Sequence, residues 1–260
     1  MMIERVALLI ESWDGLPVSP IHSAKKDMED WYSFLTSSLG GAWSEHEIKP
    51  LHSPIKKSCL SKISLFAQKC DYLFIAYSGH GGRNSKGDYI NIHDGEILYL
   101  REILNAISNK CSATIILDAC RSIRQLQEQV EFITNDYEED YNLYAAQIIW
   151  NKAFIRLKKN IVIIQSCSAG QSANSGAYIS NNGFFTEALI ESAKEWSKHV
   201  GNGAVLNTYQ AFYIATNYMN RKYGGLINSQ DPQYTPSINI TFPFAVNARI
   251  TTSLFYPRML

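Results

Sequence analysis

The chain has 260 residues, of which 46% are hydrophobic, so it can bury the core of one large domain. Its 24 basic and 24 acidic residues give a formal net charge of zero, which argues against nucleic acid as the main partner. No stretch approaches the ~18 consecutive apolar residues that a membrane span needs. We therefore expect neither a nucleic-acid partner nor a membrane partner.

The five cysteines are odd in number, and none belongs to a CxxC pair. This pattern argues against a disulfide framework and a zinc knuckle, and it favours a reducing compartment. The apolar run at residues 6–10 ends at Glu11, so it is too short for a signal peptide. These features together predict a cytoplasmic protein.

Short apolar runs alternate along the chain with segments of helical periodicity. In chain order we expect a strand at 5–10, a helix at 28–39, a weaker strand at 47–51, a helix at 55–66, a strand at 72–77, a helix at 100–107, strands at 113–117 and 161–165, helices around 184–196 and 205–219, and a last strand at 238–242. Strands that alternate with helices form βαβ units. The expected fold class is α/β, an αβα sandwich with a mostly parallel central sheet.

Residues 125–159 interrupt this alternation. The first part of the segment is acidic, and neither Gly nor Pro occurs in it. It is either a helical insertion or a linker, and a solvated helix face would also explain its charge. Since no domain boundary is evident, we expect a single domain spanning residues 1–260 with this acidic segment as an internal junction.

Two short motifs follow the ends of buried strands. His80 stands in S-G-H-G after the strand at 72–77, and Cys120 stands in D-A-C-R-S after the strand at 113–117. Reactive groups gather at the carboxyl ends of parallel strands, so these side chains can meet. A Cys–His pair supplies a nucleophile with its base, and the imidazole can hold the thiol as thiolate. Either residue alone would indicate only a structural role, because a buried Cys is usually a small core side chain.

This ordered pair of motifs resembles the caspase, metacaspase and paracaspase clan of cysteine peptidases, over about residues 6–242. Other matching features are Asp27 on the first helix, residues 166–173 after the strand at 161–165, G-F-F-T at 183–186 and Q-D-P-Q at 230–233. The resemblance implies a caspase-like fold, with residues 1–124 as the large-subunit-like part and 160–260 as the small-subunit-like part. The chain resembles bacterial stand-alone members, which analogy links to antiviral defence or cell death.

The resemblance also implies catalytic roles. Cys120 would attack the scissile carbonyl of a protein or peptide substrate, and His80 would carry the proton to the leaving amine. The backbone N–H groups of Gly81 and Cys120 would form the oxyanion hole.

The substrate-binding pocket that the resemblance implies is acidic. Metacaspases have Asp two positions before the nucleophile, here Asp118, and Asp27 and Ser78 match further wall positions. Residues 18–24, which match the stretch where caspases have an arginine, contain none. A buried carboxylate favours a cationic partner, so we expect cleavage after Arg in preference to Lys. The alternative is that Asp118 turns inward to cap backbone N–H groups.

Other residues give weaker signals. Cys167 also follows a strand, but no histidine motif accompanies it, so we expect it to pack in the core. Asp94, with Asp88 and Glu96 nearby, leaves a calcium site open, although no EF-hand pattern is present and a solvated loop is the default. The remaining histidines lack ligand spacing, so we expect no zinc site and no resident cofactor.

Three functional hypotheses remain open. The leading one is an endopeptidase that a regulatory signal activates. A different one is a pseudoenzyme or signalling module that uses the fold to bind a ligand; the presence of both dyad residues disfavours it. A third, compatible with the first, is a sensor in which a small signalling ligand orders the site. The sequence indicates no oligomeric state.

Overall fold

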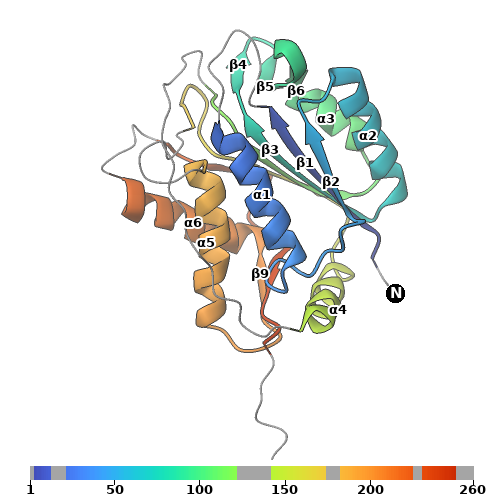
Figure 1. Ribbon diagram of the computed structural model, residues 1–260, viewed down its shortest axis with the longest axis vertical. Coiled ribbons are helices and arrows are strands. Elements are labelled where there is room, and N and C mark those ends of the chain that lie inside the picture. Colours follow the sequence, from blue (N-terminus) through green and yellow to red (C-terminus); the bar gives the residue numbers. More distant parts are fainter. Residues whose placement is uncertain (1–2, 13–21, 122–141, 174–181, 225–229, 250–260) are drawn as a thin grey trace, which may run out of the picture.

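The computed structural model describes residues 3–12, 22–121, 142–173, 182–224 and 230–249. Within these residues, a six-stranded sheet has the order β10-β8-β7-β3-β1-β2 (Figure 1). Its neighbouring strands are parallel except for β10 and β8. The strands are β1 (Arg5–Ser12), β2 (Ile48–His52), β3 (Tyr72–Gly79), β7 (Ser112–Asp118), β8 (Ile161–Gln165) and β10 (Gln233–Thr235).

Helices pack on both faces of this sheet, which confirms the expected αβα sandwich. One face is covered by α1 (His22–Thr36), α4 (Leu143–Phe154), α5 (Phe184–Lys198) and α6 (Thr208–Tyr223). The other face is covered by α2 (Lys56–Lys69) and α3 (Leu100–Ile107). Figure 1 shows α1, α5 and α6 on one side of the sheet and α2 and α3 on the other.

The central strands are buried on both faces, as their uninterrupted apolar runs predict. Side chains alternate along β7, so Ile116 packs in the cluster under α1 and α5, whereas Ile115 and Leu117 pack in the cluster under α2 and α3. The same alternation directs Asp118 toward α1 and α5. At its carboxyl end the strand therefore places the acidic Asp118 on the side of α1 and α5 and the apolar Leu117 on the side of α2 and α3.

A small antiparallel sheet that the sequence pattern did not predict follows β3 directly. It consists of β4 (Gly81–Asn84), β5 (Gly87–Asn91) and β6 (Ile97–Tyr99), with a short 3-10 turn at His93–Gly95. These strands are short. The sequences of β4 (G-G-R-N) and β5 (G-D-Y-I-N) contain Gly, Arg, Asp and Asn rather than an apolar run. They form because Ile90 and Leu98 bury against the cluster under α2 and α3.

The predicted strand at 238–242 is wrong. Ile240 N–H donates to Ser237 O in a turn, and Ile238 is 56% exposed. The last strand is instead β11 (Pro243–Val246), which pairs with β9 (Val205–Asn207) in a separate two-stranded sheet. The alternating apolar and polar residues at 238–242 imitate a strand, but the segment begins with a turn, and only Ile240 and Phe242 of its apolar residues contact the core.

The end of the acidic segment is part of the core. Residues 125–141 of that segment lie outside the described residues, but α4 occupies 143–154, and Asn142 caps it by accepting from Ala145 N–H at 2.9 Å. Trp150 is 1% exposed and stacks on Phe154 with ring centroids 5.5 Å apart. Of the two alternatives, a helical insertion or a linker, residues 143–154 agree with the helical insertion, because they form a helix that packs against the sheet.

Candidate active site

His80 and Cys120 follow the ends of two neighbouring strands. β3 and β7 are parallel, with Ser78 opposite Asp118 as their last pair. Positions 80 and 120 therefore each come two residues beyond this pair, at the same edge of the sheet. Both side chains are partly exposed. The register thus brings the two motifs together at the carboxyl edge, where reactive groups gather in parallel sheets.

Gly81 lies directly against the segment that carries Cys120, the expected nucleophile. A Cβ at this position would lie 2.8 Å from the Ala119 Cβ and 3.1 Å from the Cys120 carbonyl oxygen, so no side chain fits there. Both N–H groups assigned to the oxyanion hole, those of Gly81 and Cys120, therefore belong to backbone segments in close contact.

The turn that carries His80 is anchored from below by Tyr77. Its hydroxyl lies 2.7 Å from the His80 carbonyl oxygen and 2.6 Å from the Asn91 carbonyl oxygen, within donating distance of both. Asn91 N–H also donates to His80 O at 2.9 Å. The backbone under the imidazole is therefore fixed to β5 and to the core residue Tyr77, which is 1% exposed.

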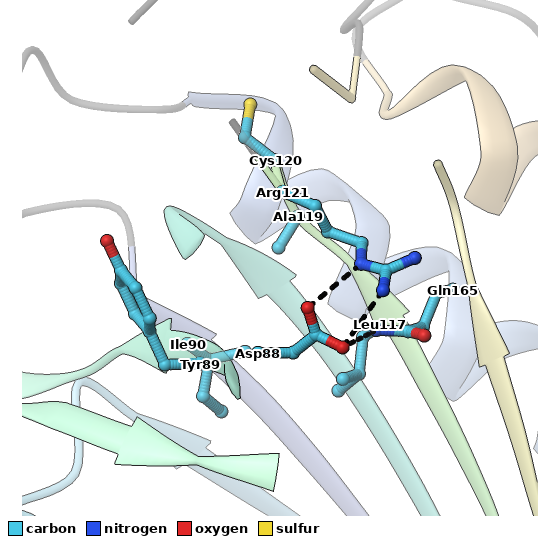
Figure 2. A pocket seen from close by; sticks show the side chains of 8 residues that line it. All are labelled: Asp88, Tyr89, Ile90, Leu117, Ala119, Cys120, Arg121 and Gln165. Carbon is cyan, nitrogen blue, oxygen red and sulfur yellow. Dashed lines mark hydrogen bonds and ion pairs between the residues drawn. The ribbon is translucent and has the colours of Figure 1, made fainter. Parts of the chain in front are cut away.

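The Cys120 thiol is hydrogen-bonded to a neighbouring loop. Figure 2 shows its side chain pointing away from the end of β7, and Sγ donates to Ala173 O at 3.6 Å. Burial raises the pKa of this thiol, and Asp118 adds to the rise. Both effects favour the neutral thiol over the reactive thiolate in this conformation.

Cys167 is a poor candidate for the nucleophile. Its side chain is fully buried, and Sγ donates to Ala119 O and Gln171 O, each at 3.5 Å. Burial raises the pKa of this thiol to about 12. Cys167 thus packs beneath the site, as expected for a core residue.

The three residues expected to line the acidic pocket lie together on the α1 and α5 face. Ser78 Oγ donates to Asp27 Oδ2 at 2.5 Å, and Gly183 N–H donates to Asp27 Oδ1 at 2.9 Å. Thr186 donates to Asp118 Oδ2 from its N–H at 3.0 Å and from its hydroxyl at 2.9 Å. These bonds join the ends of β3 and β7 to the start of α5, whose amino end favours negative charge.

The two carboxyls are close enough to influence one another. A Cβ at Gly183 would collide with Asp118 Oδ2 and lie 3.0 Å from Asp27 Oδ2. Burial raises the pKa of Asp27 well above its usual range, and the charge of Asp118 raises it further. Burial also raises the pKa of Asp118, against the bonds from Thr186. In this conformation both carboxyls are buried, and Asp118 accepts from Thr186 N–H in the first turn of α5. The alternative for Asp118 had placed such a cap at the end of its own strand.

The opposite face of β7 carries a second polar group beside the nucleophile. Arg121 bonds Asp88 of β5 through Nε at 3.2 Å and Nη2 at 2.9 Å, and its Nη1 donates to Cys167 O at 2.9 Å. Figure 2 shows this pair in the wall of a small pocket lined by Asp88, Tyr89, Ile90, Leu117, Ala119, Cys120, Arg121 and Gln165. Both side chains are largely buried, at 10% and 13% exposed. The ion pair joins the nucleophile segment to the hairpin that begins at Gly81.

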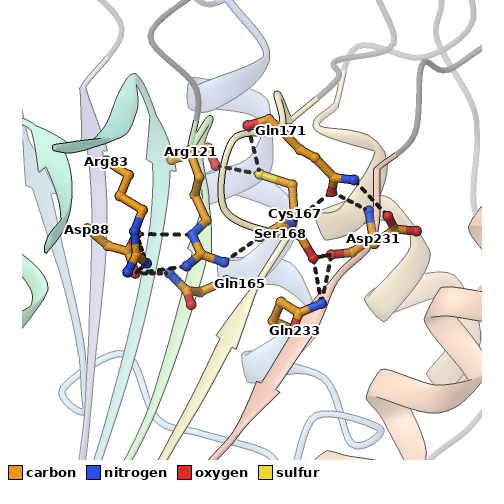
Figure 3. A network of polar contacts seen from close by, with 10 residues as sticks. Arg83, Asp88, Arg121, Gln165, Cys167, Ser168, Gln171, Asp231 and Gln233 are labelled. Carbon is orange, nitrogen blue, oxygen red and sulfur yellow. Dashed lines mark hydrogen bonds and ion pairs between the residues drawn. The ribbon is translucent and has the colours of Figure 1, made fainter.

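Two loops are linked to this ion pair on its far side (Figure 3). Arg121 N–H donates to Gln171 O at 2.9 Å. The Gln171 side chain donates to Asp231 Oδ2 at 2.7 Å and accepts from Asp231 N–H at 2.9 Å. Gln233 Nε2 donates to Ser168 Oγ at 2.7 Å. The segment that holds the Cys120 thiol is therefore tied to the loop that leads into β10.

The structure offers no preformed metal centre among the residues it describes. Asp94 is exposed, Asp88 is bonded to Arg121, and Glu96 accepts from Lys56 N–H at 2.7 Å. The three acidic residues named for calcium thus have different surroundings. In the described part of the chain, no helix has the length and apolar character that crossing a membrane requires. Residues 18–21 and the His22 side chain, which bear on the expected pocket, lie outside the description.

Comparison with known proteins identifies the class. Residues 4–238 match the protein family described as "Caspase domain", so the chain belongs to this family of cysteine peptidases. Among solved structures, it is similar to the crystal structure of caspase-1 from Spodoptera frugiperda, with a TM-score of 0.61 and 11% sequence identity. That match covers 95% of this chain and 92% of the other, and it shows the shared fold. A search of curated proteins found no significant match.

Sequence reasoning missed the polar groups that surround the dyad. Thr186 and Gly183 were noted only for their resemblance to a family motif, and no partner was assigned to Arg121. A charged residue next to an expected nucleophile was a usable signal for Arg121. No sequence signal connects Asp88 to it, because the contact depends on how the hairpin folds back.

Proposed function

We propose that this protein is a cysteine endopeptidase that cuts peptide bonds with Cys120 and His80. The Cys120 thiol gives its proton to His80 as its sulfur attacks the carbonyl carbon, and the N–H groups of Gly81 and Cys120 hold the oxyanion. The C–N bond then breaks as His80 passes that proton to the leaving amine, which leaves a thioester on Cys120. Water, losing a proton to His80, then hydrolyses the thioester and restores the thiol. The observation that carries this proposal is the β3–β7 register, together with the close contact of Gly81 and Cys120.

We further propose cleavage after Arg in preference to Lys. Asp27 and Asp118 are two buried acids with raised pKa values, and no basic side chain is hydrogen-bonded to either in the described residues. A guanidinium that pairs with a carboxylate through two hydrogen bonds offsets the cost of its burial, which a point-like ammonium does less well. An acidic substrate side chain would meet like charge.

The resting arrangement supports activation by a signal. The thiol is neutral and bonded to Ala173, and both pocket carboxyls are engaged by the start of α5 or its neighbours. A substrate therefore needs the segments at 171–173 and 183–186 to shift. A small signalling ligand or calcium is the proposed trigger, and a role in bacterial antiviral defence or cell death rests on the family resemblance alone.

A matched set of peptides that differ only in the residue before the cut tests the specificity. Arg should be cleaved fastest, Lys more slowly and Asp not at all. Asp118→Ala should reduce kcat/KM for Arg peptides by about 10²-fold or more, since it removes a buried charge partner. Thr186→Val, which keeps the carboxylate but removes one of its bonds, is the control and should retain the preference. Efficient cleavage after Asp, or an unchanged Arg preference in Asp118→Ala, would contradict this assignment.

The alternative is a pseudoenzyme that binds a ligand through the same fold. Its supporting observation is the raised pKa of Cys120. It predicts no cleavage of any peptide with any activator, whereas the peptidase predicts turnover once the thiol is released from Ala173.

A further inference from the structure

Asn91 lies directly opposite His80 in the hairpin that follows β3. β4 and β5 are antiparallel, with Gly81 paired to Ile90. Asn91 N–H donates to His80 O at 2.9 Å, which extends the ladder by one pair to His80 and Asn91. Directly opposed residues of an antiparallel pair point their side chains to the same face, with Cβ atoms about 4.5–5.5 Å apart. The Asn91 side chain is thus within reach of the imidazole.

The neighbouring residues show that this face of the hairpin points away from the core under α2 and α3. Ile90 and Ile92, on either side of Asn91, bury in the cluster under α2 and α3. Alternation therefore directs Asn91 away from that core, to the side on which a Cβ at Gly82 would collide with the Tyr89 ring. Tyr89 is the residue opposite Gly82, so cross-strand neighbours share a side here as the pairing requires.

The Asn91 side chain has an unused acceptor at this place. Its Oδ1 atom is buried and has no hydrogen-bond partner among the described residues. Leaving a buried amide oxygen unpaired costs free energy, so such an atom in a folded protein calls for an explanation. Both backbone groups of Asn91 are engaged, with His80 O and the Tyr77 hydroxyl, so the side chain cannot move far from the imidazole.

We propose that Asn91 is a positioning residue for His80: in the assembled site its Oδ1 accepts the N–H of one imidazole nitrogen, and the other nitrogen then faces Cys120. This inference rests on the proposed function, because it assigns His80 the role of base. An acceptor on one ring nitrogen fixes both the tautomer and the ring orientation. A neutral amide does this without adding a charge that would favour the imidazolium.

Two substitutions separate this role from a merely structural one. Asn91→Ala removes the acceptor and should lower kcat by about 10- to 10²-fold with little change in KM, because substrate binding is untouched. Asn91→Asp keeps the shape and the acceptor but adds a negative charge. It should therefore retain more activity than Asn91→Ala and move the acidic limb of the pH–rate profile upward by about one pH unit, since a neighbouring carboxylate favours the charged imidazole, which cannot act as a base.

Asn84→Ala is the matched control. Asn84 is an exposed amide at the far end of the same hairpin, where it bonds Lys86 N–H and the Tyr99 hydroxyl. The control should keep the wild-type kcat and pH profile. Loss of kcat in Asn84→Ala equal to that in Asn91→Ala would assign the effect to hairpin stability and overturn the proposal.

An NMR titration of the His80 ring tests the contact without turnover. The proposal predicts a higher His80 pKa in the near-isosteric Asn91→Asp than in the wild type, whatever happens to the fold of Asn91→Ala. An identical titration in both proteins, or a wild-type kcat in Asn91→Ala, would overturn it. If the His80 pKa differs between the two proteins but the wild type cleaves no peptide, the contact between Asn91 and His80 is retained and the proposed peptidase function is rejected.

Discussion

Asp27 and Asp118 lie against the same residue, Gly183, and both carboxyls are buried. Burial and the neighbouring Asp118 raise the pKa of Asp27, so the folded protein binds a proton there more tightly than the unfolded chain does. The stabilisation this proton provides is complete at low pH. It is lost as the pH rises from the usual carboxyl range through the raised pKa. This buried pair of carboxyls therefore makes the fold less stable as the pH rises.

Asp27→Asn should reverse this effect. The amide is neutral, and it can still accept from Gly183 N–H. The unfolding temperature of the variant should exceed that of the wild type by a margin that grows as the pH rises, to about 3 °C or more, and the gain should shrink on acidification, where the wild-type group is protonated. Thermal unfolding at several pH values measures it, with Asp94→Asn as the control because that side chain is 71% exposed. Lower stability at neutral pH, or a gain independent of pH, would contradict the account.

At the scale of elements, the Arg121–Asp88 pair connects the nucleophile segment to the β4–β5 hairpin. One guanidinium bonds both Asp88 oxygens and Cys167 O, a geometry that lysine cannot reproduce. Removing one partner of a largely buried ion pair leaves the other charge uncompensated. The relative placement of Cys120 and Gly81 thus depends on this pair.

Arg121→Lys should therefore lower kcat by about tenfold or more and also lower the unfolding temperature. Arg83→Ala is the matched control. Arg83 bonds the same carboxylate at 3.0 Å, but its side chain is 48% exposed, and exposed ion pairs contribute little. Steady-state kinetics on an Arg peptide compares the two variants. Equal effects would show that the activity depends on neutralising the Asp88 charge rather than on the bonds of the Arg121 guanidinium to Asp88 and Cys167.

The elements that the sequence predicted well are those whose environment is uniform. β1, β3, β7 and β8 are buried on both faces, so their composition alone marks them within a residue or two. Because His80 and Cys120 follow two of these strands, their meeting at one edge could also be predicted. The small sheet of β4, β5 and β6 could not be predicted, since it depends on packing against α2 and α3. Asp88 and Asn91 lie in this sheet, so their contacts could not be predicted from the sequence either.

At the scale of the whole molecule, the acidic segment bears on how the peptidase is controlled. Its last part is α4, which packs Trp150 into the core. Residues 125–151 contain no Lys, Arg or His, so a peptidase specific for basic residues has no site there for cutting itself. A conformational trigger that moves residues 171–173 away from Cys120 fits these facts better than cleavage in this segment.

We therefore expect full activity without a cut between residues 125 and 151. Intact-mass measurement of the active protein, followed by peptide mapping, would locate any cleavage. A cut inside this segment that is required for activity would contradict the expectation. Cuts at the basic residues that follow it, such as Lys152 or Arg156, would not.

The most direct test of the central claim is covalent labelling with a peptidyl chloromethyl ketone that carries Arg beside its carbonyl, because the attacking sulfur displaces chloride and forms a stable thioether. The account predicts a single adduct on Cys120, absent in Cys120→Ala, formed at least about 10²-fold more slowly in His80→Ala and preserved in Cys167→Ala. Peptide mapping by mass spectrometry identifies the labelled residue. An adduct on Cys167, or labelling of Cys120 that is equally fast without His80, would contradict the proposed dyad.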